Sequence, residues 1–329
     1  MHPVEYRLPA EWEPQAGLLL AWPAPNSDWR DVLDIICDEY AALIETVVAR
    51  QPVVLLVPPG DDSARRRLGR QTGIEYVEAR YDDTWCRDYG PVVMCHAGAR
   101  LALDFRFDGW GGKHEARRDD RVNALLARHP LFEEFEFRQS LFEIEGGAID
   151  CDGNGTLLFN RHCLRARHPH LDDAEVDHEL GAWFNANRLL EIDMPPLPGD
   201  DTDGHVDTLA RFVDDKRIAF QTLADAAATR RLAGQLELLR RAGGRPYELI
   251  ALPTPHDVDG SRPASYANFV LINDAVLVPR YGSRADDEAL AVLADAFPAR
   301  EAVAVGARTL ITQGGGPHCA CMHIPAALA

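Results

Sequence analysis

WCRDYGP, at Trp85–Pro91, is the first of four polar motifs whose regular spacing predicts the fold. The others are EGGAID at Glu145–Asp150, DDTDGHVD at Asp200–Asp207 and GGGPHC at Gly314–Cys319. From Asp88 to Glu145 is 57 residues, and from Glu145 to His205 is 60. From His205 to Cys319 is 114 residues, twice 57. Such spacing indicates internal repeats, and five units of this length use nearly the whole chain. We therefore expect a closed, propeller-like ring that brings the motifs to one central site.

Strand and helix patterns alternate along the chain. Apolar residues at helical spacing predict helices, at Asp28–Arg50, Ala64–Gln71, Arg118–Arg128, Asp172–Asn185, Leu223–Ala242 and Ala285–Phe297. Short apolar runs between turn residues predict strands, at Pro52–Gly60, Ile74–Val77, Val92–Cys95, Leu101–Phe107, Gly155–Asn160, Thr208–Val213, Arg217–Thr222, Ala267–Ile272, Ala275–Pro279 and Arg308–Thr312. Short polar turns within this series indicate two hairpins, one after Val213 and one after Ile272. We expect an α/β protein with mixed sheets.

Size and charge limit the classes of function. The chain has 329 residues, enough to bury a core without help from disulfides or a metal, and a net charge of −18. Because an acidic chain repels phosphate backbones, no nucleic-acid partner is expected. A negative field attracts cationic small molecules, although solubility alone also explains such a charge.

The seven cysteines are odd in number and contain no Cys-x-x-Cys pair, which favours a reducing compartment and a cytoplasmic protein. The opening MHPVEYRLPAEWEP lacks the basic start and apolar core of a signal peptide. No apolar run approaches the length of a membrane span, so no membrane partner is expected. No low-complexity linker divides the chain, so we expect a single domain over residues 1–329.

The glycines of GGGPHC make Cys319 a candidate nucleophile. Glycine permits backbone conformations closed to other residues and lets a ligand approach closely, so Gly316 is a candidate substrate contact. Cys319 would then stand at an open, tight turn, where a thiolate can react. The alternative is an ordinary buried cysteine, the commoner state of a free cysteine.

The other three motifs offer carboxylates and a histidine. His205 and Asp207 are two residues apart, so in a strand they would share a face, with His205 as a general acid/base. A polar turn before a strand also explains most of DDTDGHVD. Asp88 beside Trp85 suits a planar cation that pairs with the acid and stacks on the ring, although a surface ion pair explains it equally well. Glu145 ends an apolar run, and if buried it needs a partner such as a catalytic histidine.

Two groups of residues compete as metal ligands. One comprises His318, Cys319, Cys321 and His323, and the other comprises His162, Cys163, His168 and His170. Neither has a usual ligand spacing, so no metal is expected. The chain has neither a P-loop nor G-x-G-x-x-G, so nucleotide cofactors lack support.

Taken together, the motifs resemble the agmatine deiminase and bacterial peptidylarginine deiminase family of guanidino-group modifying enzymes. FDGWGGK at Phe107–Lys113 and the opening EWEPQAGLLLAWP at Glu11–Pro23 also resemble this family, so the likeness covers nearly the whole chain. The resemblance implies an α/β pentein propeller of five pseudo-symmetric ββαβ-type units around a central active site. It also implies a cofactor-free enzyme and a homodimer.

The resemblance assigns roles one residue at a time. Cys319 matches the nucleophile, His205 the general acid/base and Glu145 the acid that orients that histidine. Asp88 and Asp207 match the two carboxylates that grip the guanidinium. Substrate-binding positions are matched by Trp85, Trp110 and Asp201, the last near the far end of the substrate. Two departures adjoin the nucleophile, since relatives usually carry threonine at Cys321 and an aliphatic residue at Pro317.

The substrate expected from the resemblance is agmatine, converted to N-carbamoylputrescine and ammonia through a thiouronium on Cys319, in polyamine biosynthesis. A carboxylate-bearing substrate would call for an arginine in the site, whereas acidic residues such as Asp201 suit a terminal ammonium. The stretch Trp110-Gly111-Gly112 resembles the agmatine branch, while Arg106 nearby keeps free or peptidyl arginine open. A non-catalytic, metal- or ligand-binding pentein is the remaining alternative.

Overall fold

The computed structural model describes residues 6–327. Its strands are β1 Gln15–Ala21, β2 Val53–Val57, β3 Ile74–Glu78, β4 Val92–His96, β5 Ala99–Arg106, β6 Phe135–Glu143, β7 Ile149–Cys151, β8 Thr156–Asn160, β9 Arg188–Ile192, β10 Ala210–Phe212, β11 Arg217–Gln221, β12 Glu248–Leu252, β13 Val270–Ile272, β14 Ala275–Arg280, β15 Glu301–Gly306 and β16 Cys321–Pro325. Its α-helices are α1 Leu33–Val48, α2 Ser63–Leu68, α3 Cys86–Tyr89, α4 Gly109–Gly112, α5 Val122–Leu126, α6 Arg161–Arg167, α7 Asp173–Phe184, α8 Ala226–Leu238 and α9 Asp286–Ala296.

Short 3-10 turns link these elements. They are η1 Arg30–Val32, η2 Asp119–Arg121, η3 Pro130–Phe132, η4 Gly146–Ala148, η5 Val206–Thr208, η6 Tyr266–Asn268 and η7 Leu310–Gln313. None of the helices in residues 6–327 combines the length and the apolar character needed to cross a bilayer.

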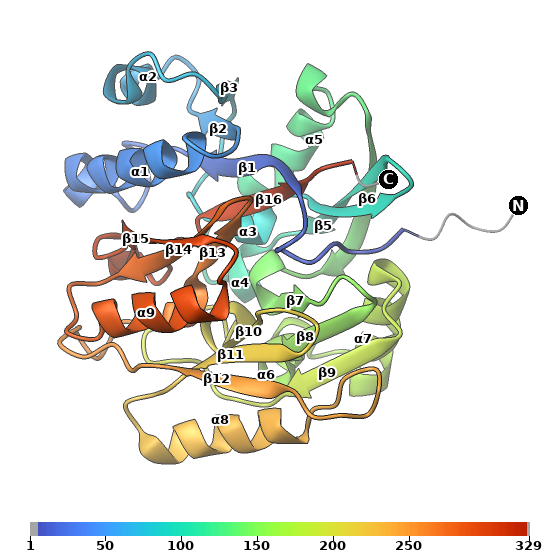
Figure 1. Ribbon diagram of the computed structural model, residues 1–329. Helices are drawn as coiled ribbons and strands as arrows, with labels where there is room; N and C mark the ends of the chain where they lie inside the picture. The colour runs from blue at the N-terminus through green and yellow to red at the C-terminus, as the bar shows by residue number, and fades with distance from the viewer. Residues whose placement is uncertain (1–5, 328–329) are drawn as a thin grey trace, which may run out of the picture.

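The strands of the described residues form five sheets gathered around a common centre (Figure 1). Four of the sheets repeat one connection, in which an antiparallel pair is followed by a helical crossover to a third, parallel strand; their orders are β4-β5-β6, β7-β8-β9, β10-β11-β12 and β13-β14-β15. This is the expected ββαβ-type unit, and both predicted hairpins are present. The helices α5, α7, α8 and α9 lie on the outside of the ring (Figure 1).

The fifth sheet closes the ring. Its order is β16-β1-β2-β3, and the C-terminal β16 is antiparallel to β1, with Leu19 opposite Met322. The last strand of the chain therefore supplies the antiparallel partner that the N-terminal unit lacks. This pairing brings the GGGPHC motif, which directly precedes β16, to the centre of the ring.

The central strands form because they are apolar on both faces. In β14, the residues from Ala275 to Pro279 are all buried between β13 and β15 and beneath α9. Strands buried on both faces appear in a sequence as continuous apolar runs, and the runs at β2, β5, β8, β11 and β14 were predicted as strands. The third strands β6, β9, β12 and β15 are only half-buried and mix charged with apolar residues, so their patterns predicted none of them. The predictions also omit β1, β7 and β16.

One predicted strand is wrong. The residues expected to form a strand at Arg308–Thr312 form the 3-10 turn η7 instead. The Glu39 carboxylate of α1 accepts hydrogen bonds from the backbone N–H groups of Thr309 and Leu310, at 2.8–3.1 Å. A distant side chain thus caps the turn, and Leu310 packs into the core.

Candidate active site

A short turn precedes the first strand of each unit, and these turns meet at the centre of the ring. They are α3 before β4, η4 before β7, η5 before β10, η6 before β13 and residues 316–320 before β16. Four of the five contain the polar motifs singled out in the sequence. The repeat therefore brings their side chains together because each occupies the same place in its unit.

A pocket of about 220 Å³ opens above these turns. It is lined by Asp28, Asp83, Trp85, Asp88, Trp110, His114, Gly199, Asp201, Thr202, Thr312, Gln313, Gly314, Gly315 and Cys319. The predicted site residues Trp85, Asp88, Trp110, Asp201 and Cys319 thus face it. His205, Glu145 and Asp207 lie beside its floor and are almost completely buried.

His205 lies between two carboxylates. Its Nδ1 is 3.6 Å from Asp88 Oδ1, and its Nε2 is 3.6 Å from Glu145 Oε2. At these distances neither ring nitrogen has a hydrogen-bond partner among the described residues. Burial opposes the charge of the ring, but Asp88, the Cys163 thiol and Glu145 outweigh it and hold the pKa of His205 well above its usual value. The ring is therefore an imidazolium whose two N–H groups are not fixed by short hydrogen bonds.

The local backbone at His205 differs from the prediction. His205 and Asp207 do not lie in a strand, because residues Val206–Thr208 form η5 and β10 begins only at Ala210. The hydroxyl of Thr202 accepts a hydrogen bond from the His205 N–H, and the hydroxyl of Thr208 donates one to the His205 carbonyl. The two side chains therefore diverge, His205 toward Glu145 and Asp207 toward Cys319.

Glu145 is ionised and is held by an ion pair with Arg167. Arg167 of α6 donates from Nε to Glu145 Oε1 at 2.5 Å, and Arg167 also binds Asp203 at 2.9 Å. Burial alone would raise the pKa of Glu145, but the nearby His205 ring and the Arg167 guanidinium lower it to about 2. Glu145 thus has the buried partner expected of it, and the guanidinium of Arg167 is a second one that no motif indicated.

Asp88 is positioned by two hydrogen bonds. Trp110 Nε1–H donates to Asp88 Oδ2 at 3.0 Å, and the Gly147 N–H donates to Asp88 Oδ1 at 3.0 Å. Burial raises the pKa of Asp88 to about 6, with His205 opposing and Asp207 and Glu145 adding to the rise. Position 147 must be glycine, because a Cβ there would lie 2.5 Å from His205 Nδ1.

Trp110 adopts an unusual backbone conformation. Its φ of 58° and ψ of 50° lie in the left-handed region, which bulky residues rarely occupy. The Asp108 side chain accepts from the Gly111 N–H at 2.7 Å and holds the turn. Such a conformation costs about 1–3 kcal/mol, and here it directs the indole N–H at Asp88.

Cys319 lies against Asp207 and Asn268. The Asn268 amide donates to the Cys319 Sγ at 3.1 Å and to Asp207 Oδ2 at 3.3 Å, and Sγ is 3.7 Å from Asp207 Oδ2. Burial, followed by the charges of Asp207 and Asp88, raises the pKa of Cys319 well above its usual value. In the free protein the sulfur is therefore a thiol. Asp207 Oδ1 has no hydrogen-bond partner among the described residues.

The glycine triplet shapes the wall of the pocket. A Cβ on Gly315 would lie 2.4 Å from the Trp85 ring, so only glycine lets the chain pass over the indole. Gly316 was predicted to contact substrate, but it packs on Asn268, and Gly314 and Gly315 line the pocket in its place. The turn that directs Cys319 into the pocket leaves Gly316 packed on Asn268, outside the pocket lining.

The outer part of the pocket is acidic. Asp28, Asp83 and Asp201 join Asp88 in its lining, and no arginine or lysine does so among the described residues. Burial raises the pKa of Asp83 to about 6. Asp201 is half-exposed and contacts His114 Nε2 at 2.6 Å. Arg106 forms an ion pair with Glu143 at 3.2 Å and does not line the pocket.

Metal-ligand atoms approach one another in groupings other than those predicted. Within residues 6–327 the groups with ligand atoms inside 4.8 Å are Glu145–Cys163–His205 and Glu11–His318–His323. Cys163 and His168 belong to α6 and its C-terminal end, where His168 stacks on Phe142.

Sequence reasoning missed Asn268 and Arg167. The 114-residue interval between His205 and Cys319 spans two repeats, and Asn268 lies in the skipped turn η6, 61 residues after Asp207. The repeat length was therefore a signal for it. Arg167 has no such signal, because it reaches Glu145 from a helix outside the repeated turns.

Comparison with known proteins places the chain in a family. The family model for the Porphyromonas-type peptidyl-arginine deiminase matches residues 7–325. The agmatine deiminase of Pseudomonas aeruginosa (strain LESB58) is 30% identical over 356 residues, covering 98% of this chain and 96% of the relative.

Solved structures give the same result. The agmatine deiminase of C. jejuni with substrate bound superposes with a TM-score of 0.91 at 31% identity, over 99% of this chain and 98% of that one. The agmatine deiminase of Enterococcus faecalis has a TM-score of 0.91 at 26% identity, over 98% of this chain and 96% of that one. The ring of five units is therefore the pentein fold that the sequence predicted.

Proposed function

The chain belongs to the Porphyromonas-type peptidyl-arginine deiminase family, and from this premise we propose that it deiminates agmatine through a covalent bond to Cys319. Family membership makes the protein a hydrolase of carbon–nitrogen bonds in amidines. The proposed products are N-carbamoylputrescine and ammonia, and the proposed setting is polyamine biosynthesis.

One observation carries the choice of agmatine, namely the charge of the pocket. Four carboxylates line it, and no arginine or lysine does so among the described residues. Agmatine is a dication, with a guanidinium at one end and an ammonium at the other. Free arginine adds a carboxylate, which an acidic pocket repels and an arginine side chain would be needed to bind. Asp28, Asp83 and Asp201 instead suit the ammonium.

We propose that the guanidinium lies between two carboxylates at the floor of the pocket. Asp88 and Asp207 stand on either side of it, and Asp207 Oδ1 is free to accept its N–H groups. Two carboxylates at fixed positions orient the planar group and bring its central carbon to Cys319 Sγ. Trp85 and Trp110 line the same pocket and exclude water from the guanidinium face.

Substrate binding also activates the nucleophile. The thiol proton of Cys319 is held because Asp207 and Asp88 are negative and the site is buried. An incoming dication offsets both charges and lowers the pKa of the thiol, so that its proton leaves to solvent.

The first chemical step is attack of the Cys319 thiolate on the guanidinium carbon, which forms a C–S bond and a neutral tetrahedral intermediate. The His205 imidazolium donates its proton to one amino group, and ammonia leaves as the C–N bond breaks. A cationic thiouronium remains on the sulfur, and His205 is neutral.

The second step is hydrolysis. Neutral His205 takes a proton from water, and the resulting hydroxide attacks the thiouronium carbon. The C–S bond then breaks and the thiolate departs. The protonated ureido product passes one proton to that thiolate, which restores the Cys319 thiol. Glu145, fixed by Arg167, favours the charged form of His205 and so returns the ring to its starting state.

The test is formation of ureido product from agmatine, free L-arginine and an arginine peptide blocked at both ends, measured in parallel. We expect turnover of agmatine, with kcat/KM at least 100-fold above the other two. Preferred use of arginine or the peptide would overturn the substrate assignment and leave the chemistry standing.

The covalent step is tested separately by acid quench during turnover, followed by mass spectrometry of the peptide containing Cys319. We expect a thiouronium adduct in the wild type and complete loss of turnover in Cys319→Ala. Cys37→Ala is the matched control, because Cys37 is a buried cysteine of α1 outside the pocket. Turnover by Cys319→Ala would remove the mechanism.

A further inference from the structure

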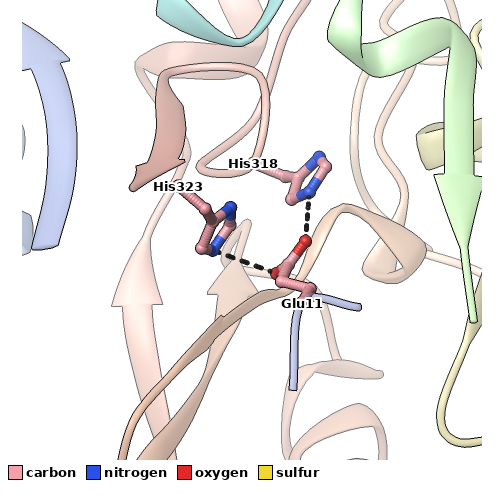
Figure 2. Close-up of side chains that lie close together, drawn as sticks. All are labelled: Glu11, His318 and His323. Atoms are coloured by element: carbon pink, nitrogen blue, oxygen red, sulfur yellow. Dashed lines mark hydrogen bonds and ion pairs between the residues drawn. The ribbon is translucent and has the colours of Figure 1, made fainter. Parts of the chain in front are cut away.

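A second buried cluster adjoins Cys319 and contributes no residue to the lining of the pocket. It joins Glu11, from the segment before β1, to His318, next to Cys319, and to His323 of β16 (Figure 2). All three side chains are at least nine-tenths buried. The chemistry described above uses none of them.

The hydrogen bonds of His318 define its protonation state. Its Nδ1 is 2.7 Å from Asp207 Oδ2, and its Nε2 is 2.8 Å from Glu11 Oε2. Burial raises the pKa values of both carboxylates, but charge and hydrogen bonding outweigh it and lower each below its ordinary value, so both are ionised. An ionised carboxylate only accepts hydrogen bonds, so both nitrogens of His318 must donate. The geometry thus calls for an N–H on each nitrogen of His318, which lies between two carboxylate oxygens.

His323 differs, although it lies beside the same glutamate. Its Nε2 donates to the Leu271 carbonyl at 2.8 Å, and its Nδ1 faces an Arg87 nitrogen at 2.7 Å. Because a guanidinium only donates, Nδ1 accepts and the ring is neutral. Neither nitrogen has a lone pair left for a metal ion. The cluster is thus a hydrogen-bonded network with one charged histidine.

The network determines which oxygen of Asp207 is available. Oδ2 binds His318 and Asn268, whereas Oδ1 has no hydrogen-bond partner among the described residues. Glu11 is itself fixed by Arg211 at 2.5 Å and by the Leu271 N–H at 2.7 Å. The chain of contacts therefore fixes one oxygen of Asp207 and leaves the other for a ligand.

We propose that His318, held as an imidazolium by Glu11, is a positioning residue that orients Asp207 and keeps it ionised for the guanidinium of the substrate. The proposal rests on the proposed function, because it takes Asp207 to be a guanidinium ligand. The other charged or titratable groups that face Asp207 are His205 on its own turn, Cys319, Arg211 of β10 and Asp88 of α3.

The protonation state can be measured without any substrate. In protein with 15N-labelled histidine rings, NMR should show His318 with both nitrogens protonated at neutral pH, the signal being assigned by its loss in His318→Asn. In Glu11→Gln the doubly protonated ring should be less populated at the same pH, because one of the two anions is gone. A neutral His318 in the wild type would overturn the proposal, whether or not the protein uses agmatine.

Kinetics test the consequence for Asp207. Loss of the charged donor in His318→Leu should lower kcat/KM for agmatine by roughly 10- to 100-fold. The acidic limb of its pH profile, which Asp88 sets in the wild type, should become steeper, because Asp207 then protonates more readily and adds a second protonation. His318→Asn, which keeps one N–H donor, should recover most of the activity.

His323→Gln is the matched control, because His323 is buried in the same cluster and does not contact Asp207. It should leave the pH profile unchanged, whatever it does to the melting temperature. A wild-type profile and kcat/KM in folded His318→Leu would overturn the proposal. If His318→Leu does not fold, the same kinetic test is made with His318→Asn and Glu11→Gln. Wild-type pH profiles of kcat/KM in both variants would overturn the proposal.

Discussion

His205 and His318 each lie between two buried carboxylates, yet the two histidines are held very differently. The nitrogens of His205 are 3.6 Å from Asp88 and from Glu145, whereas those of His318 are 2.7 and 2.8 Å from Asp207 and Glu11. Short contacts to a carboxylate at each ring nitrogen fix the N–H groups of His318. The N–H groups of His205 have no such partners in the described part of the chain and can be transferred more readily. The comparison separates a histidine suited to transfer protons from one suited to hold a fixed charge.

The largest expected effect comes from replacing His205, the histidine proposed to transfer protons. In His205→Gln, kcat should fall by about 10²- to 10⁴-fold, because the proposed mechanism then lacks the group that donates a proton to ammonia and accepts one from water. Rapid-quench kinetics with agmatine measure this loss. The drop should exceed that of His318→Leu, and equal drops would erase the distinction between the two histidines.

His168→Gln is a suitable control for that variant. His168 is also buried, stacks on Phe142 and contacts the Glu143 carbonyl at 2.8 Å. It touches neither carboxylate of the site, so its replacement should alter the free energy of unfolding and leave kcat within about twofold of wild type.

A second prediction concerns the anchor beneath His205. Arg167→Met leaves Glu145 as a buried charge without its guanidinium, which should destabilise the fold by about 3–5 kcal/mol. It should also lower kcat, since Glu145 then protonates more readily and no longer favours the imidazolium. Urea unfolding and initial rates measure the two effects.

Arg161→Met separates stability from catalysis. Arg161 is a buried arginine at the other end of α6, and it binds Asp177 and Glu191 away from the site. We expect a smaller loss of stability, because those carboxylates are partly exposed, and an unchanged kcat. A lowered kcat in Arg161→Met would show that damage to α6, and not the charge of Glu145, slows the enzyme.

The smallest expected effect concerns the two carboxylates proposed to bind the guanidinium, Asp88 and Asp207. Burial raises the pKa of Asp88 to about 6, whereas the pKa of Asp207 is lowered. The proposed mechanism requires ionised Asp88, so kcat/KM should fall as the pH drops below about 6. Trp110→Phe removes a hydrogen bond that lowers this pKa, so the midpoint should move up by less than about one pH unit.

The pH dependence of kcat/KM for agmatine tests this shift. Trp183→Phe is the control, because its indole N–H binds Glu179 on the same surface helix and does not reach the pocket. A midpoint that stays in place in Trp110→Phe would mean that another group controls the acidic limb.

The predicted ring and the central strands follow from local patterns. The buried runs at β2, β5, β8, β11 and β14 are continuous in sequence, and the polar motifs recur at one interval because each precedes the first strand of a unit. The third strands were missed because they are only half-buried and mix charged with apolar residues. The strand expected at Arg308–Thr312 was wrong because the distant Glu39 carboxylate caps a turn there.

By itself, the sequence determined that Asp88, Glu145, His205, Asp207 and Cys319 belong together, because repeat spacing is a property of the chain. Only the tertiary structure decided what holds them. Asn268, Arg167 and Glu11 reach these residues by hydrogen bonds or ion pairs between segments that no local pattern connects, the longest being Glu11 with His318 across 307 positions. The protonation states follow from the same packing, because burial and neighbouring charge act through space and not along the chain.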